Sequence, residues 1–118
     1  MVTKKQNMNF NSVEEVYDEA IRLSEKAEVV RPDLQTIGNM VMKAMEELGE
    51  LSTDLLKLSG YKVNSEDKAA ISENAKEEAI DGILIYINIC NKLGITKEEF
   101  IEIAGRKLNK WDSKHLTK

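Results

Sequence analysis

Residues 34–60 read LQTIGNMVMKAMEELGELSTDLLKLSG, and their periodicity sets the expected architecture. Apolar side chains recur here at alternating steps of three and four residues, which is the spacing of one face of an α-helix. Arg31-Pro32-Asp33 predicts the helix start, because proline suits the first turn, and Gly60 predicts its end. We expect a helix of about seven turns. Its apolar stripe comprises Leu34, Ile37, Val41, Ala44, Leu48, Leu51, Leu55 and Leu58.

Three further helices are expected around this one. Two capping-box pairs, Ser12 with Glu15 and Thr96 with Glu99, predict the starts of the first and the fourth helix. A third helix is expected over 70–93, and its second half is apolar on nearly every side, as buried helices are. Four helices with short connections and no strand-like alternation predict an all-α antiparallel four-helix bundle.

Length and composition restrict the class of protein. The 118 residues suit one domain, 1–118, in which residues 1–10 are expected to fray and 111–118 form a short basic tail. A net charge of −4 argues against a nucleic-acid binder. No apolar run reaches the about 18 residues of a membrane span, and no signal-peptide pattern is present, so we expect a cytoplasmic protein.

Two pairs of acids carry the expected chemistry. Glu47 and Glu50 lie three residues apart on one helix face, and Glu78 and Asp81 repeat this spacing on the next helix. If these helices pack antiparallel, the four carboxylates converge. Converging buried carboxylates repel one another, and a hard cation with oxygen ligands, such as Mg²⁺, would compensate. Glu47 and Glu50 alone would suggest a solvated face, and Glu78 and Asp81 would suggest it less because their helix is so apolar, but both pairs together favour a metal that bridges to a polyphosphate.

Three other side chains are candidates for substrate contact. Lys43 lies four residues before Glu47 on the same side of the helix. Asn88 lies two turns after Asp81, where it either contacts a base edge or the metal, or is a buried amide bonded to backbone. Lys107 is expected to contact phosphate, the simpler alternative being a favourable cation at a helix C-terminus.

Four residues have structural interpretations that we favour. Cys90, the only cysteine, is expected to be a buried thiol. Trp111 suits the bundle core better than stacking on a base. Gly49 and Gly82 cost stability inside a helix, so we expect the helices to approach closely there.

The order of the motifs resembles the MazG-like all-α nucleoside-triphosphate pyrophosphohydrolase superfamily, which also includes dimeric dUTPases and dCTP pyrophosphatases. That family carries EExxE on one helix and ExxD on the next. Glu46-Glu47-x-x-Glu50 matches the first motif, and Glu78-x-x-Asp81 matches the second. The resemblance covers about residues 34–110.

The resemblance implies hydrolysis of a nucleoside triphosphate, NTP or dNTP, to the monophosphate and pyrophosphate. It implies Mg²⁺ as cofactor, with Mn²⁺ as a substitute, and a homodimer or homotetramer. The implied metal ligands are Glu47, Glu50, Glu78 and Asp81. Glu46 has a secondary role, because it lies about 100° from Glu47 around the helix. The family's Lys-x-x-x-Asn-x-x-Arg segment is matched only at Lys107, since Trp111 and Lys114 stand where Asn and Arg are usual.

In this reading either Glu47 or Glu50 accepts the proton of the attacking water. The alternative is a non-enzymatic helical interaction or scaffold protein whose acids are surface charge, and it predicts a melting temperature independent of Mg²⁺. A di-iron bundle is set aside, because it needs two Glu-x-x-His pairs and the chain has only His115.

Overall fold

The computed structural model describes residues 8–60 and 65–116. Its elements are α1 (Val13–Val30), α2 (Ile37–Gly60), α3 (Ser65–Lys92), α4 (Lys97–Trp111) and the short π-helix η1 (Asp112–Leu116). No strand occurs in these residues. The expected all-α class is therefore confirmed.

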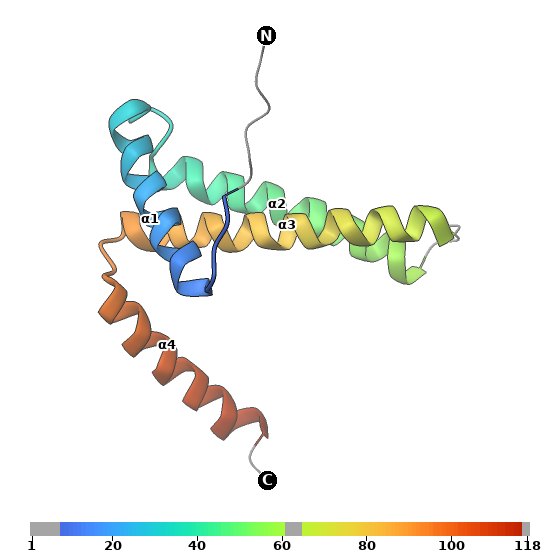
Figure 1. Cartoon of the computed structure of the whole chain (residues 1–118). Helices are drawn as coiled ribbons and strands as arrows, with labels where there is room; N and C mark the ends of the chain where they lie inside the picture. The colour runs from blue at the N-terminus through green and yellow to red at the C-terminus, as the bar shows by residue number, and fades with distance from the viewer. Residues whose placement is uncertain (1–7, 61–64, 117–118) are drawn as a thin grey trace.

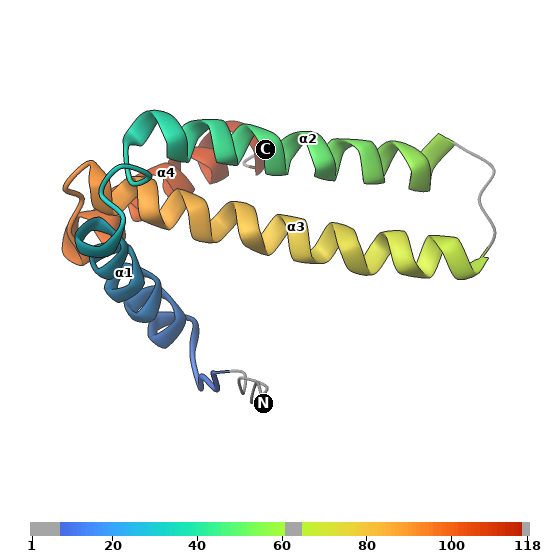
Figure 2. The ribbon, with the colours of Figure 1, turned by 90° about the horizontal axis from the view of Figure 1, so that it is seen from above.

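The two longest helices, α2 and α3, form an antiparallel hairpin (Figures 1 and 2). Helix α1 packs across the C-terminal half of α3, where Lys92 Nζ lies 2.6 Å from Glu28 Oε2. Helix α4 then leaves the hairpin at an angle (Figure 1). Among the described residues, no Cα atom of α4 comes within 8 Å of a Cα atom of α1, α2 or α3. Helix α4 therefore extends from the hairpin as an arm.

The predicted helix ends are mostly confirmed by local hydrogen bonds. The Ser12 hydroxyl accepts from the backbone N–H of Glu15 at 3.1 Å, and Thr96 and Glu99 form the reciprocal capping box of α4. After α3, Gly94 has a φ of +78°, which glycine adopts without strain. Its N–H donates to Asn91 O while the next N–H donates to Cys90 O, both at 3.0 Å, in a Schellman motif.

Three boundaries differ from the sequence prediction. Helix α2 begins at Ile37 rather than at Arg31-Pro32-Asp33, because Thr36 accepts from the backbone N–H of Asn39 at 3.2 Å and caps the helix there. Helix α3 begins at residue 65 rather than at 70. The expected basic tail is partly helical, since α4 ends at Trp111 and η1 follows it.

The seam between α2 and α3 includes only part of the apolar stripe expected for α2, namely the half-buried Ala44, Leu51 and Leu58. Its most buried side chains on α2 are Met40, Glu47 and Asp54, spaced by seven residues. The neighbouring stripe members Val41, Leu48 and Leu55 are 41%, 65% and 51% exposed. The hairpin therefore buries two acids and leaves aliphatic side chains on its outer face.

The apolar core of the chain is small. Among the described residues the buried hydrophobic side chains are Met40, Ala75 and Ile89, and none of the described side chains is fully buried. The expectation that Gly49 and Gly82 allow close helix approach is wrong within one chain, since a Cβ atom at either would meet no atom within 4 Å. The four helices thus leave much apolar surface uncovered.

No single helix in the described ranges is long and apolar enough to cross a membrane. Helices α3 and α4 together have the length and composition of a membrane span, but only as a span that is bent by 118° at the break between them.

Candidate metal centre

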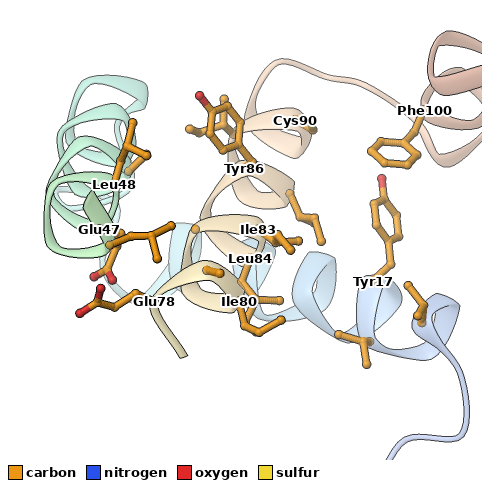
Figure 3. A pocket seen from close by; sticks show the side chains of 18 of the residues that line it. Tyr17, Glu47, Leu48, Glu78, Ile80, Ile83, Leu84, Tyr86, Cys90 and Phe100 are labelled. Carbon is orange, nitrogen blue, oxygen red and sulfur yellow. The ribbon is translucent and has the colours of Figure 1, made fainter. Parts of the chain in front are cut away.

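Three buried acids lie at the α2–α3 seam. Glu47 and Asp54 come from α2 and Glu78 from α3, and each is 8% exposed. Glu47 and Asp54 share a face because they are seven residues apart, which is two helical turns. Figure 3 shows the carboxyl groups of Glu47 and Glu78 pointing to the same side, away from the apolar side chains nearby.

Asn74 on α3 joins two of these acids. Its amide nitrogen donates to Asp54 Oδ2 and to Glu78 Oε1, both at 2.8 Å. These two bonds use both hydrogens of the amide group. Glu78 Oε2 is buried, and no donor from any described residue reaches it. One amide therefore serves two buried carboxylates, and one oxygen of Glu78 remains unsatisfied.

The electrostatics at Glu78 disfavour its ionised form. Burial raises the pKa of Glu78 above the ordinary value of 4.5, and the nearby charges of Asp54 and Glu50 raise it further. The hydrogen bond from Asn74 opposes this rise. A proton or a cation at this position would relieve the repulsion, and both fit the unsatisfied Glu78 oxygen.

The donor set suits a hard cation only in part. Glu47, Asp54 and Glu78 offer buried carboxylate oxygens, the ligand type that Mg²⁺ prefers. Glu50 and Asp81 are exposed. In the part of the chain that the structure describes, no three acidic, histidine or cysteine side chains are close enough together to hold a metal ion. A cation here would need the exposed acids to turn inward.

Lys43 is the expected substrate residue that lies beside the acids. Its Nζ is 3.4 Å from Glu47 Oε1 and 3.5 Å from Glu46 Oε1, and these two charges raise the pKa of Lys43, Glu46 most. At Glu78, by contrast, the nearby charges that act on the carboxyl group are those of the acids Asp54 and Glu50. Lys43 thus marks the end of the cluster where positive charge is already present.

Asn88 and Lys107 are placed elsewhere. The amide oxygen of Asn88 accepts a hydrogen bond from the Ser24 hydroxyl, to which Asn91 also donates, at 3.3 Å. These contacts hold α1 against α3. Lys107 is exposed on α4, ten residues after Lys97, whose Nζ lies 2.8 Å from Glu14 Oε1 of α1. Within one chain neither residue is brought to the acids.

Asp54 and Asn74 were missed by the sequence analysis. Asp54 was detectable, because it lies four residues after Glu50 and seven after Glu47, on the side of the helix that these acids share. Asn74 lies four residues before Glu78, the spacing at which helical side chains meet. Both signals are weak in the sequence alone, because they become informative only once the face of α2 that meets α3 is known.

An apolar groove begins beside these acids. Its cavity volume is about 1280 Å³, and Glu47 and Glu78 are among the few charged side chains that line it. Tyr17, Leu48, Ile83 and Phe100 show that α1, α2, α3 and α4 all contribute walls (Figure 3).

Comparison of the chain with protein-family models, with curated proteins and with solved structures finds no match.

Proposed function

We propose that the chain is a Mg²⁺-dependent nucleoside-triphosphate pyrophosphohydrolase that releases pyrophosphate and the nucleoside monophosphate. The observation that supports the proposal is the pattern of burial at the seam between α2 and α3. Acids occupy buried positions there, while aliphatic side chains beside them are exposed. Burying like charges costs stability, and while Lys43 pairs with Glu47, one buried oxygen of Glu78 has no partner among the described residues, which supports a bound cation beside Glu78. The order of the EExxE and ExxD motifs supports the same reading.

In this proposal Glu47 and Glu78 hold the metal from the two sides of the seam, and Glu50 and Asp81 turn inward to complete the ligand set. Asp54 adds negative charge beside Glu78. Bound Mg²⁺ would neutralise charge on the triphosphate and favour ionisation of a water at neutral pH. Either Glu47 or Glu50 accepts the proton of the attacking water. Lys43, beside Glu47, stabilises phosphate charge.

The finer architecture belongs to the same proposal. A closed antiparallel bundle needs more helices packed together than the α2–α3 hairpin and α1 supply. We infer that the expected homodimer or homotetramer supplies them. Lys107 would contact phosphate only in such an assembly, because within one chain its helix extends from the hairpin.

The test is pyrophosphate release from a panel of canonical and modified nucleoside triphosphates, with and without Mg²⁺. We expect Mg²⁺-dependent release with at least one of them. Glu47→Gln, Glu78→Gln and Asp81→Asn are expected to lower turnover by roughly a hundredfold or more, because each removes a charge that acts on the metal. Glu77→Gln, the exposed neighbour of Glu78, is the matched control.

A scaffold function is the second candidate, and the exposed aliphatic side chains on α2 favour it. It predicts no pyrophosphate release with any nucleotide and no effect of Mg²⁺ on melting. Circular dichroism of each variant separates loss of chemistry from loss of helix. Release that survives both Glu47→Gln and Glu78→Gln would exclude the metal site described above.

A further inference from the structure

Asp54 and Asn74 lie outside both acidic motifs, yet the seam between α2 and α3 brings them to Glu78. Asp54 is as buried as Glu78, each being 8% exposed. It lies four residues after Glu50, about one helical turn further along α2 than the EExxE motif. Neither Asp54 nor Asn74 belongs to the ligand set of the proposed catalytic metal, so their meeting with Glu78 needs an explanation of its own.

One amide group holds the two carboxyl groups together. The side-chain nitrogen of Asn74 donates to Asp54 Oδ2 and to Glu78 Oε1, both at 2.8 Å. The second oxygen of Glu78, Oε2, is buried and receives no hydrogen bond from any described residue. A buried polar atom without a partner is rare in folded proteins and often marks the place of a water or an ion. The Glu78 oxygen therefore indicates a ligand at this point of the seam.

The charge and the available donor atoms favour a cation as this ligand. The negative charges of Asp54 and Glu50 act on the Glu78 carboxyl group. Hard divalent cations bind carboxylate oxygens and the carbonyl oxygens of asparagine side chains. Asn74 has such an oxygen, because a half-turn of its amide group exchanges Nδ2 for Oδ1. Asn74 is exposed, so the amide can turn without displacing packed neighbours, and an ion can enter from solvent.

We propose that Asp54, Glu78 and Asn74 form a Mg²⁺ site of their own, in which the Asn74 amide turns to present its oxygen to the ion. In the metal-free chain the two N–H groups of this amide take the place of the cation between the carboxylates. Mg²⁺ suits three protein ligands better than Ca²⁺ does, because Mg²⁺ keeps several waters whereas Ca²⁺ takes about 6–8 oxygen ligands.

This site differs from the proposed catalytic one in its ligands and in what fills it. The two share Glu78, whose two carboxylate oxygens can each bind an ion. The Asp54 site fills in the absence of nucleotide and ties α2 to α3, so it does not rest on the proposed hydrolysis.

The experiment is isothermal titration calorimetry of the metal-free full chain with Mg²⁺, without nucleotide. Asp54→Asn removes a charged ligand and is expected to weaken binding roughly tenfold or more. Asp81→Asn makes the same change at an exposed acid of the proposed catalytic site and is the matched control. We expect it to bind Mg²⁺ as the wild type does. Circular dichroism checks that each variant keeps its helices.

Asn74→Ala separates a ligand from a mere hydrogen-bond donor. If Asn74 only donates, its amide competes with the cation, and removing it tightens Mg²⁺ binding. If its oxygen is a ligand, Asn74→Ala binds Mg²⁺ more weakly than the wild type, which is the result that we expect. The side-chain amide resonances of Asn74 give a second readout by NMR. They should shift at saturating Mg²⁺, because the two hydrogen bonds to carboxylates are lost, while those of Asn109 on α4 stay in place.

Three results would overturn the proposal. One is a wild-type chain that binds no Mg²⁺ until nucleotide is added. Another is binding that Asp81→Asn weakens as much as Asp54→Asn does, which would assign the ion to the catalytic acids. The third is tighter binding in Asn74→Ala, or Asn74 amide resonances that Mg²⁺ leaves unchanged. None of these results bears on pyrophosphate release, which tests the proposed function separately.

Discussion

Asn74 joins Asp54 and Glu78, two of the three buried acids, across the seam. Replacing it by alanine removes its bonds to Asp54 and Glu78 and leaves both carboxylates less satisfied. We expect Asn74→Ala to lower the free energy of unfolding by about 1–3 kcal/mol, measured by urea denaturation in metal-free buffer. Glu77→Ala, exposed one turn away, controls for the change in helix propensity. Equal stability of the two variants would mean that the bridge contributes nothing.

Glu78 is expected to destabilise the chain in the absence of metal. Burial and Asp54 raise the pKa of Glu78, so its ionised form is less favoured in the folded than in the unfolded state. The stability that the protonated carboxyl contributes below pH 4.5 is therefore lost as the pH rises above that value. Glu78→Gln should therefore raise the melting temperature at neutral pH in metal-free buffer by a few degrees.

Mg²⁺ should reverse the order of the two melting temperatures, so that the wild type melts above Glu78→Gln. It is expected to raise the melting temperature of the wild-type chain by roughly 5 °C or more at saturation and to leave Glu78→Gln unchanged. The measurement is calorimetry with and without Mg²⁺, with Glu77→Gln as control. If Glu78→Gln melts at a lower temperature than the wild type in metal-free buffer, the Glu78 charge is compensated within the chain.

Cys90 offers a pH-dependent probe of the groove. Burial raises the pKa of its thiol above the ordinary value of 9.0, and the thiolate is the reactive form. Alkylation by iodoacetamide at pH 8 should therefore be several-fold slower than that of a free cysteine, and its midpoint should lie above pH 9.0. Mass spectrometry of the alkylated fraction against pH gives the profile. A midpoint below the ordinary value would place the thiol in a more polar environment.

At the level of elements, the helices were predictable and their register was not. The capping pairs at Ser12 and Thr96 and the stop at Gly94 depend on neighbouring residues, so the sequence contains all that determines them. The seam depends on which of two adjacent faces of α2 meets α3. The whole apolar stripe was expected on one face, but Val41, Leu48 and Leu55 are exposed, whereas Glu47 and Asp54 are buried. Apolar periodicity cannot distinguish an intrachain from an interchain surface.

The candidate metal centre was also predicted only in part from the sequence. Glu47 and Glu78 were expected together, and both are buried at the seam. Asp81 was expected to join them and is exposed. Its place depends on the rotation of α3 about its axis, which only packing against other helices determines.

Two glycines should respond in opposite directions to alanine. An added Cβ at Gly49 meets no atom within 4 Å, so Gly49→Ala should stabilise α2 by about 0.5–1 kcal/mol. Gly94 has φ +78°, so Gly94→Ala should destabilise the α3–α4 connection by about 1–2 kcal/mol. Thermal denaturation measures both. If Gly49→Ala destabilises the chain instead, another surface approaches α2 at that turn.

For the whole molecule, assembly and metal binding are expected to contribute to stability separately. A chain whose fold is completed by a second copy melts at a temperature that rises with protein concentration. Ile83→Glu, which places a charge in the apolar groove, should abolish this rise yet retain the increase caused by Mg²⁺, because it removes none of the carboxylates proposed to hold the metal. Glu78→Gln should retain the rise with protein concentration and lose the increase caused by Mg²⁺. Melting curves of the wild type and both variants at two protein concentrations, with and without Mg²⁺, test this independence. Loss of both effects in Ile83→Glu would instead show that the carboxylates bind metal only when two chains are joined.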